Sequence, residues 1–320
     1  LRLLNDSGVD ALILADLGVF RMAQREAPNC ELHVSTQVSI ANAACAAAWH
    51  ELGAKRVVLA RELSLEEIRV IRRDTPPELE LETFAHGAMC VSYSGRCLIS
   101  QYMTGRDANH GACAQPCRWN YSLMEEKRPG QFFPVEEDGR GTYLYNSKDM
   151  CMIEHVPELI KAGITSFKIE GRNKTAYYAA CVTGAYRAAI DTYKKDPENF
   201  VLPQFCRDEV NKVSHREYYT GFYFGNQENG QHYGDSQYIR EYEVVGMPVE
   251  CDDSGKAVFA LKNRFFDGEE LELIQPGQAP YVFRAENVTD DEGTERELFN
   301  VPQMRVHFAF PFKVSEWAIL

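Results

Sequence analysis

Four cysteines lie close together in one stretch of this chain of 320 residues. They are Cys90, Cys97, Cys113 and Cys117, which follow the pattern C-x6-C-x15-C-x3-C. Four thiolates in so short a stretch can bind a single metal centre, which would supply redox or Lewis-acid chemistry. Nearby glycines permit tight turns, and nearby arginines can offset the negative charge of ligated thiolates. This stretch is therefore the first candidate site.

The spacing of these cysteines bears on which metal they would bind. Structural zinc usually takes ligand pairs that are two to four residues apart. Cys113 and Cys117 meet that rule, whereas Cys90 and Cys97 are too far apart. Cubane iron–sulfur clusters tolerate wider spacing because each cysteine binds a different iron. The spacing favours iron–sulfur over zinc and leaves unligated thiols as a third alternative.

The composition bears on the compartment and the partners. Six further cysteines are scattered along the chain: Cys30, Cys45, Cys151, Cys181, Cys206 and Cys251. The cysteine density is below that of disulfide-stabilised secreted domains, so we expect small buried side chains and a reducing cytoplasm. The net charge of −13 argues against broad nonspecific binding of nucleic acid but leaves room for a local basic face.

The N-terminus shows no secretory signal, and no apolar run approaches the roughly 18 residues that span a bilayer. The opening letters LRLLNDSG are typical of the end of a helix. We therefore expect the chain to begin within a domain, after a strand.

The elements that must position the cysteines alternate between strand and helix over residues 1–197. Apolar runs typical of buried parallel strands occupy residues 9–15, 31–36, 55–60, 79–85 and 164–170. Helical patterns occupy residues 40–52 and 176–193, and Ser64 would cap a further helix that carries Glu67 at its third position. Such repeats predict an α/β fold with a parallel sheet. We expect a complete or partial TIM-like β/α barrel, with a doubly wound open sheet as the alternative.

Three segments depart from this alternation. Residues 86–148 form a cysteine-rich insertion, whose end at 129–149 is typical of a hairpin returning to the barrel. An insertion of that length is usually functional or disordered, and its aromatic residues argue against disorder. Residues 198–237 are polar and aromatic, as expected of a linker. Residues 238–320 alternate short strands with turn residues, which predicts a small C-terminal all-β barrel domain.

Polar side chains follow the predicted strands at their carboxyl ends, where the sites of parallel α/β domains gather. They are Ser35, Thr36, Gln37, Arg61, Glu62, His86, Lys168, Glu170 and Arg172. Lys168 and Glu170 are two residues apart, so both face the same side of an extended strand. With Arg172 just beyond, they could hold an acidic substrate and move a proton. The alternative is an internal salt-bridge network in the barrel.

Four side chains allow more than one interpretation. His86, just before the cysteines, could be a base, a metal ligand or a structural histidine. His110 is either a loop residue near the metal centre or simply exposed. Tyr93 and Tyr102 would line a cavity or pack around the cysteines.

The combined motifs resemble one known family. The segments GAMCVSYSGRCLISQYMTGRDANHGACAQPCRW, NSKDM and SFKIEGR are similar to those of the unassigned-type peptidase family 32, the collagenase-like peptidases. The resemblance runs from about Val9 to Tyr193, and the trailing β domain also resembles that family. It is closest to the branch of prephenate-dependent tRNA uridine hydroxylases, which make 5-hydroxyuridine at the wobble position of bacterial tRNA. Related branches hydroxylate a cytidine of 23S ribosomal RNA or the ubiquinone ring.

The resemblance implies the cofactor and the partners. It implies a 4Fe–4S cluster on the four cysteines of the insertion, with Cys151 in reserve should Cys117 be free. It also implies prephenate as a co-substrate and tRNA as a transient partner. The oligomeric state is left open.

The first hypothesis is thus an RNA-modifying oxidoreductase. Its arginines and lysine would bind the carboxylates of prephenate or the RNA phosphates. These residues are Arg61, Arg172 and Lys168, and Arg118 of the insertion would hold tRNA together with the β domain. Glu170 or His86 would move a proton, and a flipped base is expected.

Two other hypotheses assign the chain to different classes of protein. The second is a peptidase, as the family name says, although no G-x-S-x-G elbow or HExxH helix occurs. A cysteine nucleophile paired with His86 is conceivable. The third is a non-catalytic binding module in which the cysteines hold a structural zinc.

Overall fold

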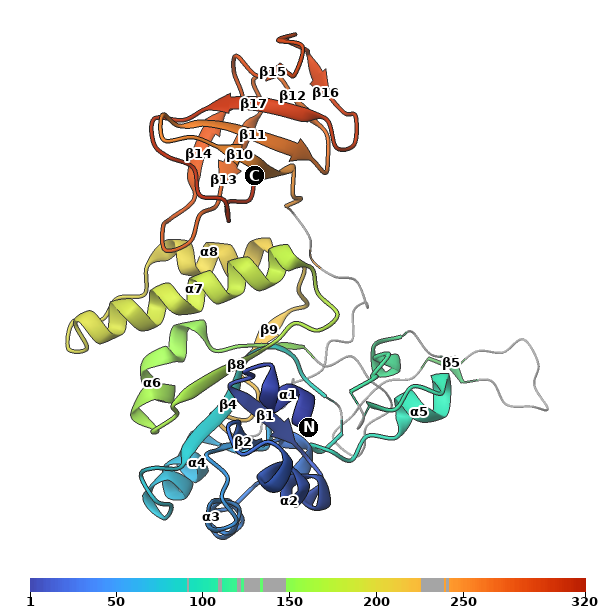
Figure 1. Cartoon of the computed structure of the whole chain (residues 1–320), viewed down its shortest axis with the longest axis vertical. Helices are drawn as coiled ribbons and strands as arrows, with labels where there is room; N and C mark the ends of the chain where they lie inside the picture. The colour runs from blue at the N-terminus through green and yellow to red at the C-terminus, as the bar shows by residue number, and fades with distance from the viewer. Residues whose placement is uncertain are drawn as a thin grey trace. The chain divides into compact units, whose positions relative to one another are not determined.

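The computed structural model describes residues 1–90, 92–108, 111–119, 122–123, 133–134, 148–225, 239 and 242–320. The chain divides into two compact units (Figure 1). The first unit comprises Leu1–Glu170 and His215–Tyr238, and the second comprises Gly171–Ser214 and Ile239–Leu320.

A seven-stranded sheet forms the centre of the first unit. Its strands are β1 (Ala11–Leu14), β2 (Glu31–Val34), β3 (Arg56–Val58), β4 (Glu80–Ala88), β7 (Asp149–Cys151), β8 (Ser166–Glu170) and β9 (Tyr218–Tyr219). Strands β1, β2, β3, β4 and β8 pair in parallel in that order. Strand β7 pairs with the end of β4 in the antiparallel direction, and β9 runs parallel to β7. Apolar runs without alternation, such as Val57–Leu59, form these strands because parallel sheets are covered on both faces.

Helices connect and flank these strands. They are α1 (Arg2–Asp6), α2 (Leu17–Glu26), α3 (Ala43–Glu51), α4 (Leu65–Arg73), α5 (Ile99–Thr104) and α6 (Val156–Lys161), with the short 3-10 helices η1 (Thr36–Val38), η3 (Pro116–Arg118) and η4 (Ile153–His155). The predicted cap of α4 is confirmed: the Ser64 hydroxyl accepts the Glu67 N–H, and the Glu67 carboxylate accepts the Ser64 N–H at 2.8 Å. A two-residue pair, β5 (Ser122–Leu123) with β6 (Phe133–Pro134), lies in the insertion.

The parallel α/β sheet is confirmed, and its closure into a barrel is not. Among the described residues, β1 has β2 as its sole strand partner, so the sheet ends there. The TIM-like barrel stays a prediction. Most of the predicted hairpin at 129–149 and all of His110 lie outside the described residues.

The second unit begins with two helices and ends in strands. Helices α7 (Ala176–Lys195) and α8 (Gln204–Lys212) precede an antiparallel sheet of β10 (Gly246–Cys251), β11 (Lys256–Leu261), β17 (Arg305–Ala309) and β15 (Thr289–Asp290). Two further pairs are β12 (Phe265–Phe266) with β16 (Leu298–Phe299), and β13 (Glu270–Leu273) with β14 (Tyr281–Arg284). Residues 198–237, expected to be a linker, therefore contain helix α8 and strand β9.

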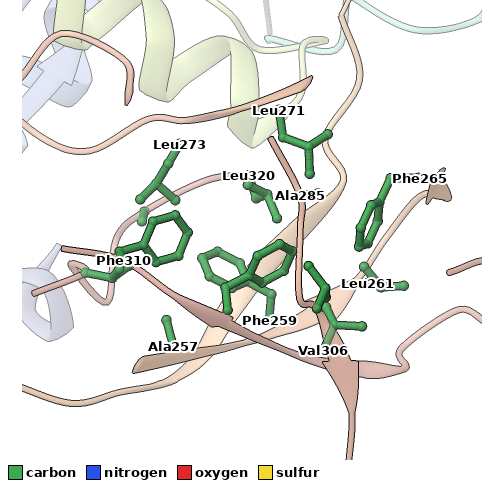
Figure 2. Packing of buried hydrophobic residues seen from close by; sticks show 14 of the residues in the cluster. Ala257, Phe259, Leu261, Phe265, Leu271, Leu273, Ala285, Val306, Phe310 and Leu320 are labelled. Atoms are coloured by element: carbon green, nitrogen blue, oxygen red, sulfur yellow. The ribbon is translucent and has the colours of Figure 1, made fainter. Parts of the chain in front are cut away.

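An aromatic core holds the C-terminal strands together. Phe259, Phe265 and Phe310 are buried in one cluster of side chains (Figure 2). The ring of Phe265 stacks on Phe299 with centroids 4.8 Å apart. An all-β C-terminal region is thus confirmed, since β-branched and aromatic residues alternate onto a shared interior.

None of the ten cysteines forms a disulfide. Of the scattered ones, Cys30, Cys181 and Cys206 are buried as expected, and the others are half-buried. No helix in the described ranges is long and apolar enough to cross a membrane.

Candidate active site at the carboxyl ends of the strands

The cysteine segment, residues 90–119, is fastened to the ends of β2 and β3. The Glu62 carboxylate accepts the backbone N–H of Ser94 at 2.9 Å and its hydroxyl at 3.2 Å. The Ser94 hydroxyl accepts the backbone N–H of Arg61 at 3.4 Å. The polar residues predicted at the end of the third strand therefore hold the segment.

The 3-10 helix η1, which follows β2, makes the second attachment. Gly95 has a left-handed φ of 73°, and a Cβ there would overlap the carbonyl oxygen of Gln37. The Gln37 side-chain amide donates to the carbonyl of Ala108 at 3.4 Å. Only glycine permits so close an approach, so the cysteine segment lies directly against the backbone of Gln37 at this position.

Two of the other predicted ligands affect the pKa of Cys90. Desolvation is the largest effect on the Cys90 thiol and raises its pKa, although the residue as a whole is exposed. The backbone N–H of Ser92 donates to this sulfur and lowers the pKa, and the Arg61 guanidinium lowers it as well. Cys97 and Cys113 lie close enough for their charges to raise it. The charges of Cys97, Cys113 and Arg61 therefore all act on the Cys90 sulfur.

The remaining features of the donor set fit thiolate ligands. The sulfur of Cys113 accepts the backbone N–H of Gln115 at 3.3 Å. Cys117 lies half-buried in η3, which packs against α5. Backbone N–H groups aimed at sulfur stabilise thiolates and tune iron–sulfur clusters. No three His, Cys, Asp or Glu side chains of the described ranges converge on a single ion, and a cubane spreads its ligands over four irons.

Arg61 is a nearly buried cation beside these thiols. Its side chain is 14% exposed, and its Cζ lies 3.7 Å from the centroid of the Phe84 ring. One guanidinium nitrogen donates to the carbonyl of Ala88 at 3.2 Å, and another lies 3.9 Å from a carboxylate oxygen of Glu170. Burial lowers the pKa of Arg61 and the charges of Glu170 and Cys90 oppose that shift. Arginine stays charged in proteins, so the site contains a fixed positive charge.

Lys168 is held by a carboxylate that sequence reasoning missed. Its Nζ lies 2.7 Å from Oε1 of Glu82, a buried residue of β4. The other Glu82 oxygen accepts the Ser166 hydroxyl at 2.7 Å and lies 3.2 Å from Arg56. Burial alone would raise the pKa of Glu82, but Lys168, Ser166 and Arg56 together hold it below its usual value. For Lys168, the structure has the internal salt-bridge network that was the alternative.

The sequence does contain a feature that points to Glu82. It interrupts the apolar run of the fourth predicted strand, and a carboxylate in a buried strand needs a cation partner. The strand pairing puts Phe84 beside Lys168. Lys168 contacts Glu82, and Glu170 lies beside Arg61. This is expected for two side chains at the same end of one strand.

His86 is buried and contacts Tyr218, a residue of the expected linker. Its Nε2 lies 3.3 Å from the hydroxyl of Tyr218, and the two rings meet edge to face. The Tyr218 ring stacks on His215 with centroids 4.2 Å apart. The His215 Nδ1 lies 2.6 Å from the carbonyl of Arg216 and must donate, since a carbonyl only accepts. No local sequence pattern joins residues so far apart in the chain.

The other predicted residues stand apart from this group. Arg172 belongs to the second unit, so its relation to Arg61 stays a prediction. The side chain of Arg118 lies outside the described part of the chain. Cys151, the reserve ligand, pairs with His86 across β4 and β7. Tyr93 and Tyr102 are exposed, which contradicts packing around the cysteines.

The first unit is an α/β domain that has thiols, a buried guanidinium and carboxylates near its strand ends. These groups make it a domain with a candidate metal and anion site. Residues 1–233 match the sequence profile described as peptidase family U32, and residues 240–320 match the profile of the peptidase family U32 C-terminal domain. The chain belongs to peptidase family U32.

Three curated relatives carry different names. The chain is 37% identical over 98% of its length to the tRNA hydroxylation protein P1 of Bacillus subtilis, covering 74% of that protein. It is 41% identical over 78% of its length to the 23S rRNA 5-hydroxycytidine C2501 synthase of Escherichia coli, covering 37% of that protein. It is 28% identical over 92% of its length to a collagenase of Porphyromonas gingivalis, covering 73% of that protein.

Proposed function

We propose that this protein is an RNA-modifying enzyme that hydroxylates wobble uridine of tRNA to 5-hydroxyuridine. One observation carries the proposal: identity of 37% across 98% of the chain to a tRNA hydroxylation protein. The similarity to a hydroxycytidine synthase of ribosomal RNA points to the same class of reaction on a pyrimidine. The proposed compartment is the cytoplasm, where tRNA is modified.

The proposed cofactor is a 4Fe–4S cluster held by Cys90, Cys97, Cys113 and Cys117. The influence of the Cys97 and Cys113 charges on the pKa of Cys90 supports this assignment, as does the N–H donor on the Cys113 sulfur. A bound cluster supplies one-electron redox chemistry. The attachments of the cysteine segment to Glu62 and Gln37 would hold it beside the strand ends.

Arg61 is the proposed anchor for a carboxylate of prephenate. Its Nε has no hydrogen-bond partner among the described residues, and its nearest carboxylate, Glu170, lies only at ion-pair distance. A guanidinium binds a carboxylate through two parallel hydrogen bonds, which orients the co-substrate as well as holding it. An incoming carboxylate would therefore pair with the part of the guanidinium that stays accessible, since the unpartnered Nε itself is buried.

Glu170 is the proposed proton carrier of this site. It lies beside Arg61 at the end of β8, and its side chain is partly exposed. A released proton would be taken up by this carboxylate, while Arg61 keeps the carboxylate in position. His86 is the second proton-transfer candidate, because the Tyr218 hydroxyl orients its ring.

A peptidase is the second candidate function, favoured by the similarity to a collagenase. A cysteine nucleophile needs a base within hydrogen-bond reach. The described contacts give His86 a tyrosine as its ring partner, and they give Cys90 an arginine and two other thiols. This surrounding fits ligation better than acyl transfer.

Nucleoside mass spectrometry tests the function. Total tRNA from a strain lacking the gene should lose 5-hydroxyuridine, and expression of the wild-type chain should restore it. Glu170→Gln should retain iron but fail to restore the nucleoside. Peptide hydrolysis by the purified protein, with no change in tRNA nucleosides, would establish the peptidase alternative instead.

A further inference from the structure

The cysteine segment exposes aromatic rings that a folded protein would normally cover. Tyr93 is 71% exposed, Tyr102 is 88% exposed and Trp119 is 46% exposed. Leu98, next to α5, and Met103, within α5, are exposed as well. Aromatic side chains are large apolar groups, so their gathering in one short segment marks an interaction surface.

These rings stand on a fixed support. Tyr93 lies in a turn closed by the Arg96 N–H, directly before the attachment of Ser94 to Glu62. Tyr102 is on α5, and the Ser100 hydroxyl of that helix accepts the backbone N–H of Ala114 at 2.9 Å. Helix η3, which Trp119 follows, packs against α5. A preorganised surface loses little conformational entropy when a partner binds.

The rings also lie close to the thiols. An extended chain spans at most about 3.6 Å for each residue. Tyr93 is three residues from Cys90, and Trp119 is two residues from Cys117. Their Cα atoms therefore lie within roughly 11 Å and roughly 7 Å of those of the two cysteines. A molecule that contacts Tyr93 or Trp119 is therefore near the cysteines of the segment.

The charge of the segment differs in sign from that of the chain. Residues 90–119 contain three arginines, Arg96, Arg106 and Arg118, and one acidic residue, Asp107, whereas the whole chain carries −13. Arg96 and Arg106 are exposed and form no ion pair with any described residue. Cations interleaved with exposed aromatic rings are the pattern that binds unpaired nucleic acid.

We infer that Tyr93, Tyr102 and Trp119 form a stacking face for the unpaired bases of an RNA loop, with Arg96 and Arg106 on its phosphates. This inference rests on the proposed function and says how the RNA is held. A base removed from its loop stack for reaction leaves its neighbours without stacking partners. Tyrosine and tryptophan rings beside the site replace those lost contacts without selecting a base.

Binding measurements with the full-length protein test the stacking face. The probes are an RNA hairpin with an unpaired loop and a fully paired RNA duplex of the same length. Tyr102→Ala and Trp119→Ala should each weaken hairpin binding by about fivefold to a hundredfold, the range known for one stacked base. Duplex binding should not change. Tyr102→Phe should bind the hairpin as the wild type does, and Tyr102→Leu should bind as weakly as Tyr102→Ala.

Salt dependence separates stacking from charge. The alanine variants should keep the wild-type slope of log affinity against log salt. Arg96→Gln and Arg106→Gln should each reduce that slope by about 0.7, as expected for one phosphate contact on a single strand. Leu3→Ala, an exposed change on α1, is the remote control. Circular dichroism melting confirms that each variant is folded.

Four results would overturn the inference. Alanine variants that bind the hairpin as tightly as the wild type, in a protein that still modifies tRNA, would remove the stacking face and leave the proposed function intact. Equal losses for hairpin and duplex would exclude recognition of unpaired bases. A fall in oligomer mass in Tyr102→Ala would assign the face to a second copy of the chain. A wild-type protein that neither binds the hairpin nor changes tRNA nucleosides would remove both proposals.

Discussion

Gly95 tests whether the cysteine segment is clamped onto the sheet. Its φ of 73° is left-handed, and a Cβ there would overlap the carbonyl oxygen of Gln37. Gly105, in the same segment, has a φ of 70°, but a Cβ there would meet no atom within 4 Å. Alanine at either position introduces the same backbone strain, and only Gly95→Ala forces the segment away from Gln37 of η1.

The expected magnitudes differ for that reason. A left-handed backbone costs alanine about 1–2 kcal/mol, which is the full effect expected of Gly105→Ala. Gly95→Ala must also lift the segment, which breaks the two hydrogen bonds from Ser94 to the Glu62 carboxylate. Hydrogen bonds to charged groups contribute about 1.5–3 kcal/mol each. We expect Gly95→Ala to favour opening by about 3 kcal/mol beyond Gly105→Ala, roughly a hundredfold in the equilibrium.

Cys97 reports this opening because its side chain is buried. The assay is the rate of alkylation of Cys97 in the metal-free protein, followed by peptide mass spectrometry. The rate should be roughly a hundredfold higher in Gly95→Ala than in Gly105→Ala, since labelling follows the open population. Hydrogen exchange at residues 92–108 is an independent measure. Equal alkylation rates in the two variants would refute the clamp.

Two further predictions concern the buried groups of the first unit. Because folding lowers the pKa of Glu82, its ionised carboxylate stabilises the fold. This stabilisation is complete at pH values above the ordinary pKa of 4.5, and it is lost as the pH falls through the lower folded-state pKa. Acid unfolding curves should therefore show a smaller loss of stability below pH 4.5 in Glu82→Gln than in the wild type, and identical curves would contradict the ion pair with Lys168. Tyr218→Phe removes the hydroxyl that contacts His86 and should lower the free energy of unfolding by about 1 kcal/mol in urea titrations. No change in the urea midpoint would mean that this contact contributes nothing.

Local patterns in the sequence predict the local parts of this fold. The parallel strands are continuous apolar runs, and the cap of α4 needs only Ser64 and Glu67 at the correct spacing. The polar ends of β2 and β3 are also visible in the sequence, although their role in holding Ser94 is not. These features depend on neighbours in the chain, so spacing alone reveals them.

The parts that sequence reasoning missed depend on distant residues. Strands β7 and β9 are too short for any periodicity, and β9 joins the sheet from a segment that was expected to be a linker. The contact between His86 and Tyr218 likewise joins β4 to this distant segment of the chain. The network around Glu82 joins β4 to β8, its neighbour in the sheet but not in the chain. Such contacts follow from strand order, which periodicity does not specify.

Iron and sulfide analysis of anaerobically prepared protein tests the central claim most directly. The wild type and Cys251→Ser, a control at a half-buried cysteine of the C-terminal strands, should contain about four irons and four sulfides per chain. Cys97→Ser should lose most of both, together with the visible absorption of the cluster. Protein that contains zinc and no sulfide, or equal iron in Cys97→Ser and Cys251→Ser, would contradict the account.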